Sequence, residues 1–366
     1  MVQDSKQVAK TVPLEVTLSA SAVSKPPRTS GIELLRLLAM LAIVFYHLVG
    51  HATTQPPVGT PTSIFLRSFT VFMQPLLCVF IIISGYFLVD SKFKMKKLVR
   101  YLVQICLIPF IIALVMFLFH NNYNIEIKDV FMSAVNIQEY WFPFTYLLIC
   151  AGYPLINYFI RKMRERSFLI VIGVTLIINI IFTITRINIT WVFCNAIWAL
   201  QLYLIGAYLK KYPRKAFEKR LLWFIISTSL LLIVLVIFIF TRYNLNESRF
   251  DLIPVLIAVP IFVLFKNFKF HNKYLNILAT TVFTVYLVHD NIYLRQWLWG
   301  EVFVLELYFN SYHIIWFSLV AALTVYLGGI ILGLIYHYTV DLLFQKVLDK
   351  RLDKMQQELL VGTVRQ

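Results

Sequence analysis

Ten stretches of predominantly apolar residues divide this chain, and most are about 20 residues long, the length that a helix needs to cross a bilayer core. Hydrophobic residues make up 60% of the 366 residues and charged residues 14%, against about 45–50% and about 25% in soluble domains. A soluble globular protein is therefore excluded. The pattern predicts an all-α, polytopic membrane helix bundle with spans over residues 32–51, 69–89, 98–119, 141–160, 167–185, 190–209, 221–241, 252–265, 275–294 and 314–340.

The net charge of +16 follows this predicted topology. Outside the ten spans, 26 lysines and arginines fall on one set of alternate segments and 6 on the other. Basic residues concentrate on the cytoplasmic side of membrane proteins, so both termini are predicted to be cytoplasmic and the protein to be a multi-pass protein of the cell membrane. The charge then indicates topology and attraction to anionic membrane lipid, and it does not indicate nucleic-acid binding.

Two polar tails flank the predicted spans. Residues 1–30 are rich in Ser, Lys, Thr and Pro, a composition that predicts a mobile cytoplasmic tail. Residues 341–366 form a second cytoplasmic tail, whose first part could be a short amphipathic helix on the inner membrane surface. The four cysteines, Cys78, Cys106, Cys150 and Cys194, lie in apolar runs without metal-binding spacing, so we expect buried thiols and no metal.

The first predicted span carries three ionisable residues, Glu33, Arg36 and His47, in the run GIELLRLLAMLAIVFYH. Such groups are costly to place in a membrane, which makes each a functional candidate. Arg36 and His47 are eleven residues apart, so at ~100° per residue they share one helix face, with Arg36 near the cytoplasmic surface. Glu33 is placed to pair with Arg36.

Each residue also has a purely structural alternative. Arg36 could extend to the inner membrane surface, and His47 could be a neutral buried histidine with one hydrogen bond. Their common face favours a polar stripe that lines a cavity.

The ninth predicted span holds Tyr286, His289 and Asp290. Successive spans alternate in direction, so the ninth span runs in the same direction as the first. His289 therefore lies at a depth similar to that of His47. We expect Asp290 to orient His47 and Tyr286 to donate a hydrogen bond in the same site. The alternative is a polar outer helix end that faces water.

The Arg-x10-His spacing, with an acidic residue three positions before the arginine, resembles membrane-bound acyltransferase family 3. Four further segments resemble the family in the same order, over roughly residues 31–340: VFIIISGYFL, YWFPFTYLLICAGYPLIN, LQLYLIGAYL and TVYLVH. The resemblance implies that 31–340 is a transmembrane acyltransferase domain. It implies transfer of an acyl group, most often acetyl from acetyl-CoA, to a carbohydrate hydroxyl, as on a cell-surface or exported polysaccharide. His47 is the candidate base for that hydroxyl's proton.

The phosphates of CoA need cations on the cytoplasmic side, and the predicted topology places Arg36, Lys96, Lys97 and Arg100 there. The small pair Ser84–Gly85 is expected to allow close helix packing or to line a passage for the CoA arm. The family often has Arg-x-x-Arg where this chain has Lys97-Leu-Val-Arg100, and a lysine binds phosphate without the bidentate geometry of arginine. Acetyl-CoA is expected as a co-substrate, without a permanently bound cofactor.

Two other functions remain open from the sequence. Intramembrane Arg and His with a proline-containing eighth span also suit a transporter of a sugar, glycan or lipid-linked intermediate. A membrane sensor or scaffold would leave the Arg36–His47 stripe without a purpose. For an enzyme, direct transfer and an acyl-histidine relay are both compatible with the sequence.

Overall fold

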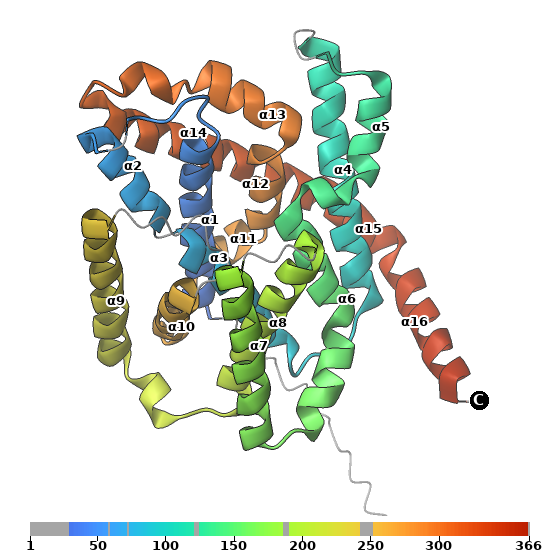
Figure 1. Ribbon diagram of the computed structural model, residues 1–366. Helices are drawn as coiled ribbons and strands as arrows, with labels where there is room; N and C mark the ends of the chain where they lie inside the picture. The colour runs from blue at the N-terminus through green and yellow to red at the C-terminus, as the bar shows by residue number, and fades with distance from the viewer. Residues whose placement is uncertain are drawn as a thin grey trace, which may run out of the picture.

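The structure is a computed structural model that describes residues 29–57, 59–71, 73–120, 124–185, 190–241 and 252–364. In that part of the chain every regular element is a helix or a helical turn (Figure 1). The predicted all-α class is confirmed. The predicted N-terminal tail, residues 1–30, lies almost entirely outside the described residues.

Seven of the described helices are long and apolar enough to cross a membrane. They are α1 (Gly31–Gly50), α4 (Met95–Phe119), α6 (Trp141–Lys162), α7 (Glu165–Thr185), α8 (Trp191–Lys211), α9 (Arg220–Thr241) and α14 (His313–Tyr336). Each coincides with one predicted span to within a few residues. Together they identify a multi-pass membrane protein.

The other three predicted spans correspond to shorter helices, so helix length does not confirm the count of ten. They are α3 (Met73–Leu88), α10 (Leu252–Lys266) and, for the ninth span, α11 (Lys273–Leu278), α12 (Val282–His289) and α13 (Ile292–Trp297).

The expectation of one continuous ninth span is wrong, and local hydrogen bonds explain why. The Thr281 hydroxyl donates to the carbonyl of Leu278 at 2.7 Å, which closes a turn between α11 and α12. The Asn291 side chain accepts from the backbone N–H groups of Tyr293 and Leu294 and thereby caps a new helix. Asparagine is favoured at the N-cap of a helix and disfavoured inside one, because its side chain bonds to nearby backbone groups. Asn291 therefore starts a new helix and does not continue α12.

The remaining elements are α2 (Pro61–Val71), α5 (Ile127–Val135), α15 (Leu342–Val347), α16 (Asp349–Val364), and the short segments η2 (Ile137–Glu139), η3 (Lys215–Glu218), η5 (Leu298–Val302), η6 (Leu305–Tyr308) and η7 (His337–Asp341). The helix expected in the C-terminal tail is therefore present as α15 and α16. Figure 1 shows α16 extending from the bundle beside α4. The Gln356 side chain on α16 accepts from the backbone N–H of Met95 at 2.9 Å.

Two glycines bring α3 and α8 into direct backbone contact. A Cβ atom at Gly85 would lie 2.1 Å from the carbonyl oxygen of Tyr203, and one at Gly206 would lie 2.1 Å from that of Ile82. Small residues permit this close approach of membrane helices. The packing role expected at the Ser84–Gly85 pair is thus confirmed for Gly85.

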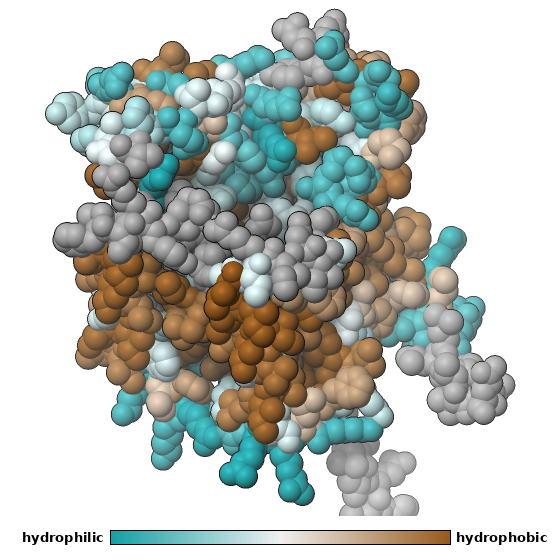
Figure 2. Space-filling model, viewed as in Figure 1, coloured by the Kyte–Doolittle hydropathy of each residue, from teal (hydrophilic) through white to brown (hydrophobic). Residues whose placement is uncertain are grey.

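One end of the bundle collects basic residues, and we call it the basic end. It is defined by Arg161, Lys211, Arg220 and Lys266, which lie at the ends of α6, α8 and α10 and at the start of α9. Lys211 donates to the carbonyl of Ile160 at 2.7 Å, which ties α8 to α6 at this end. Figure 2 shows an apolar band across the visible face between this hydrophilic fringe and a hydrophilic upper part.

Helix α1 starts at the basic end and runs through the bundle. A Cβ at Gly31 would lie 2.5 Å from the carbonyl oxygen of Phe265, so the start of α1 is packed tightly against the end of α10. Further along, α1 packs on α3, α12 and α14. Its far end, with His47, therefore lies away from the basic end.

Candidate active site

Two histidines from distant parts of the sequence form the centre of the candidate site. The Nδ1 atom of His47, near the end of α1, lies 2.9 Å from the Nε2 atom of His289, the last residue of α12. His289 is fully buried. The predicted similar depth of these two residues is therefore correct.

The hydrogen bonds of His289 determine which ring nitrogens carry protons. Its Nδ1 atom lies 2.6 Å from the carbonyl oxygen of Val285, which can only accept, so Nδ1 donates. In the neutral ring Nε2 must then accept, and Nδ1 of His47 is the donor to it. This assignment leaves Nε2 of neutral His47 with a lone pair that can take up a proton.

Asp290 lies beside this pair, where it accepts hydrogen bonds from two side chains and faces a third. Its Oδ1 atom is 3.6 Å from Nδ1 of His47, 3.1 Å from Nε2 of His51 and 3.4 Å from Nη1 of Arg295. Because α12 ends at His289, Asp290 is free of the helical geometry that would have turned it away from His289. The predicted approach of Asp290 to His47 is thus present in the structure.

Two residues of the site, His51 and Arg295, were not among the candidates that the sequence predicts. His51 follows His47 by four residues, the spacing that places two side chains on one helix face, and this signal could have identified it. Arg295 lies on α13, and only the break after α12 folds that helix back toward Asp290. No pattern along the sequence indicates that contact.

Tyr286 separates the histidines from a cavity deeper in the bundle. Its ring lies edge-on to His47, with centroids 6.0 Å apart, and 5.7 Å from the ring of His289. Phe142 packs on the same ring at 5.7 Å. Tyr286 therefore contacts both histidines through its ring, as well as forming part of the cavity wall.

The cavity has a volume of about 270 Å³. Its lining residues come from α1, α3, α4, α6 and the α11–α12 segment: Arg36, Met40, Phe80, Ser84, Tyr101, Gln104, Phe142, Tyr146, Ala279, Thr280, Val282, Phe283 and Tyr286. The Ser84 hydroxyl donates to the carbonyl of Phe80 at 2.9 Å and lies 3.3 Å from the Tyr146 hydroxyl. Arg36 and Tyr286 line the same cavity, which therefore extends from the guanidinium to the tyrosine ring that contacts the histidine pair.

Glu33 holds the guanidinium of Arg36 in place. The Glu33 Oε2 atom accepts from Nη1 of Arg36 at 3.2 Å, and Glu33 is only 2% exposed. The predicted pairing is therefore present.

A second cavity of about 760 Å³ opens at the basic end. Polar groups of α6 and α16 line it. Four cationic side chains also line it, namely Lys92, Lys94, Lys96 and Arg161. Pro154, Asn157 and Arg161 of α6 line this cavity, and Phe142 and Tyr146 of the same helix line the deeper one. The two cavities thus follow one another along α6.

The structure gives the other predicted CoA-binding cations different surroundings. Nζ of Lys96 lies 2.7 Å from Oδ2 of Asp353, and Arg100 forms a salt bridge with Asp349. Both acids belong to α16, so this C-terminal helix already neutralises these cations. Lys97 lies on α4 between the residues that line the two cavities.

The described residues contain one group that could hold a metal ion, namely His47, His51 and Asp290, whose ligand atoms lie within 4.8 Å of one another. From the sequence we expect no metal. Within this group the Asp290 carboxylate already accepts a hydrogen bond from His51, and it accepts a second from Arg295.

Comparison with known protein families gives a match to one family, described as an acyltransferase domain, over residues 29–338. Neither the curated proteins nor the solved structures with which the chain was compared contain a match. The matched range includes the cavity, Arg36, both histidines and Asp290, and it ends before α15 and α16.

Proposed function

Because the chain belongs to acyltransferase family 3, we propose that it transfers an acyl group, most simply acetyl, from acyl-CoA to a hydroxyl of a cell-surface or exported polysaccharide. One observation carries the proposal: a single cavity links Arg36 to Tyr286, whose ring contacts the His47–His289 pair. Acyl transfer to a hydroxyl needs a base near a bound acyl donor. Here His47 would be the base, and the cavity beside Tyr286 would hold the donor.

We propose ten membrane crossings in the cell membrane, with both termini and the basic end on the cytoplasmic side. The asymmetry of lysine and arginine supports this orientation. The shorter helices α3 and α10 and the broken α11–α12–α13 segment would complete the bundle around α1. Non-helical backbone at membrane depth is tolerated where protein surrounds it, and His289 and Asn291 at the α12–α13 break are buried.

The donor would enter through the cationic cavity at the basic end. Lys92, Lys94 and Arg161 would bind the phosphates of CoA, since no carboxylate pairs with them among the described residues. Lys96, Lys97 and Arg100 would assist from the adjacent turn of α4. The pantetheine arm would then pass along α6 and Ser84 toward Arg36, which brings the thioester near Tyr286.

The reaction then follows from the proton assignment at His47. The acceptor oxygen attacks the thioester carbonyl carbon while His47 Nε2 takes the hydroxyl proton. Collapse of the tetrahedral intermediate breaks the C–S bond, and the CoA thiolate recovers the proton from His47. His289 and Asp290 would orient the imidazole and stabilise its charged form.

The experiment is incubation of the purified protein with radiolabelled acetyl-CoA and a host surface glycan. We expect label in the glycan with the wild type and none with His47→Ala. His313→Ala, which alters an exposed histidine at the start of α14, is the matched control and should retain activity. Equal labelling by wild type and His47→Ala would overturn the mechanism, and movement of unmodified glycan across the membrane would favour a transporter.

A further inference from the structure

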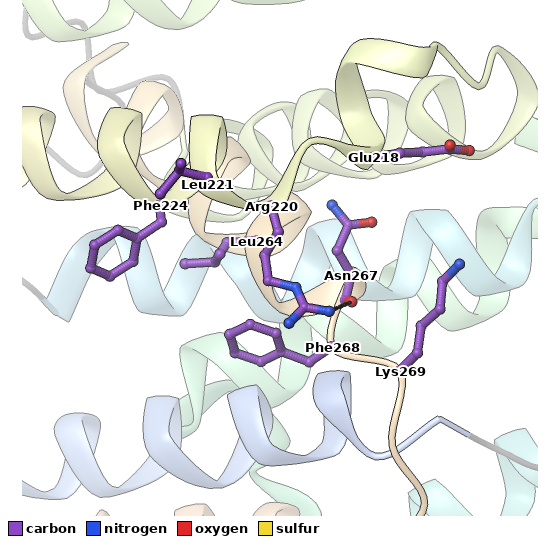
Figure 3. A pocket seen from close by; sticks show the side chains of 8 residues that line it. All are labelled: Glu218, Arg220, Leu221, Phe224, Leu264, Asn267, Phe268 and Lys269. Carbon is purple, nitrogen blue, oxygen red and sulfur yellow. Dashed lines mark hydrogen bonds between the residues drawn. The ribbon is translucent and has the colours of Figure 1, made fainter.

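A groove of about 710 Å³ lies at the basic end, between the start of α9 and the end of α10. Figure 3 shows its lining side chains, with Arg220 directed down between the two helices toward Phe268. This groove takes no part in the proposed acyl transfer. Its composition is unusual because cations occupy one end and apolar side chains the other.

Two cations line the groove, Arg220 and Lys269. The Arg220 guanidinium lies 5.5 Å from the ring centre of Phe268 and donates a long hydrogen bond of 3.4 Å to the carbonyl of Asn267. Within the described part of the chain, neither cation has a carboxylate at ion-pair distance. Glu218 also lines the groove, but Figure 3 shows its carboxylate directed away from Arg220.

The apolar part of the groove follows α9 into the bilayer region. Leu221 and Phe224 are 70% and 55% exposed, although both belong to a helix apolar enough to span a membrane. Leu264 of α10 forms the opposite wall. Exposed apolar side chains on a membrane-spanning helix are covered by lipid acyl chains.

We propose that this groove binds one anionic diacyl phospholipid of the adjacent leaflet. The lipid phosphate lies between Arg220 and Lys269, and an acyl chain lies over Leu221, Phe224 and Leu264. Arginine binds a phosphate through two parallel N–H groups, and lysine adds a point charge. The proposal depends on the chain spanning a bilayer and does not depend on its acyltransferase activity.

The test is native mass spectrometry of the purified full-length protein with phosphatidylglycerol or phosphatidylcholine added in detergent. We expect a phosphatidylglycerol adduct whose apparent affinity falls roughly tenfold or more in Arg220→Gln/Lys269→Gln, because basic residues near a membrane surface each strengthen binding of anionic lipid. Arg166→Gln/Lys215→Gln removes two exposed cations of the basic end outside the groove. This control should retain the adduct.

Two further measurements distinguish a bound lipid from a bound free anion. Phe224→Gln should weaken the phosphatidylglycerol adduct, whereas a site for phosphate alone would not respond to it. Displacement of the lipid by millimolar inorganic phosphate would overturn the proposal, as would equal adduct loss in the control double variant. Lys269→Gln, which alters one exposed side chain, provides the same comparison if the double variant fails to fold.

Discussion

Nδ1 of His47 lies 2.9 Å from Nε2 of His289, although 242 residues separate them in the chain. This contact closes a chain of hydrogen bonds that begins at the carbonyl of Val285. It orients the imidazole of His47 and leaves its Nε2 atom as the proton acceptor. The proposed chemistry therefore depends on two helices meeting at one point.

The first prediction concerns His289. In His289→Gln the amide oxygen can still accept from Nδ1 of His47, whereas in His289→Leu nothing accepts. We expect kcat to fall by roughly 10²- to 10⁴-fold in His289→Leu, the range that general acid–base catalysis contributes, and by much less in His289→Gln. Steady-state kinetics with acetyl-CoA measure the difference, and equal values for the two variants would contradict the hydrogen-bond assignment.

The second prediction concerns Asp290. Asp290→Asn keeps the size of the side chain but removes the negative charge that faces His47, His51 and Arg295. Hydrogen bonds to charged groups contribute about 1.5–3 kcal/mol, so kcat should fall roughly ten- to hundredfold. Asp341→Asn is a matched control, because Asp341 also faces a histidine, His337 at 3.3 Å, away from the site. Equal losses in both variants would remove the specific role of Asp290.

The third prediction concerns the donor cavity. Lys92→Gln/Lys94→Gln removes two cations that line it. We expect KM for acyl-CoA to rise roughly tenfold while kcat changes little, because the loss affects binding and not the chemical step. Lys350→Gln/Lys354→Gln on α16 removes two charges outside the cavity lining. A fall in kcat with unchanged KM would place the CoA phosphates elsewhere.

The fourth prediction concerns helix packing. In Gly206→Ala the new methyl group would lie 2.1 Å from the carbonyl oxygen of Ile82, so α3 and α8 must move apart. Overpacking of this kind costs typically about 1–3 kcal/mol and more where backbone is the obstacle. Gly173→Ala is the control, since among the described residues no atom outside the local backbone of α7 lies within 4 Å of its added Cβ. Thermal unfolding in detergent should show a lower Tm for the first variant only.

The fifth prediction concerns pH and the loop after α1. Burial raises the pKa of Glu306, but hydrogen bonds from the Thr53 hydroxyl and the Thr54 N–H outweigh it and hold the pKa below its usual value. A carboxyl with a lowered folded-state pKa stabilises the fold above its unfolded pKa of about 4.3, and this contribution is lost as pH falls further. The protection factors for hydrogen exchange of residues 51–57 should therefore fall on acidification, and Glu306→Gln should abolish that pH dependence.

The sequence by itself determined the class of the protein and much of its site. The long apolar runs predict an all-helical membrane bundle. In a bilayer the backbone polar groups of each such segment must be paired within it, which a helix achieves. Helical spacing placed Arg36 and His47 on one face, and the ionisable groups in that span identified them as functional candidates. These inferences depend on local periodicity, which a single sequence displays.

Tertiary structure decided the contacts between segments. Asn291 caps the helix that begins after the break at His289, and Asp290 within this break meets His51 at the end of α1 and Arg295 on α13. The pairing of Lys96 and Arg100 with Asp353 and Asp349 requires α16 to lie beside α4, which no spacing along the chain encodes. Periodicity specifies which face a side chain takes on its own helix, whereas its partners depend on how the helices pack together.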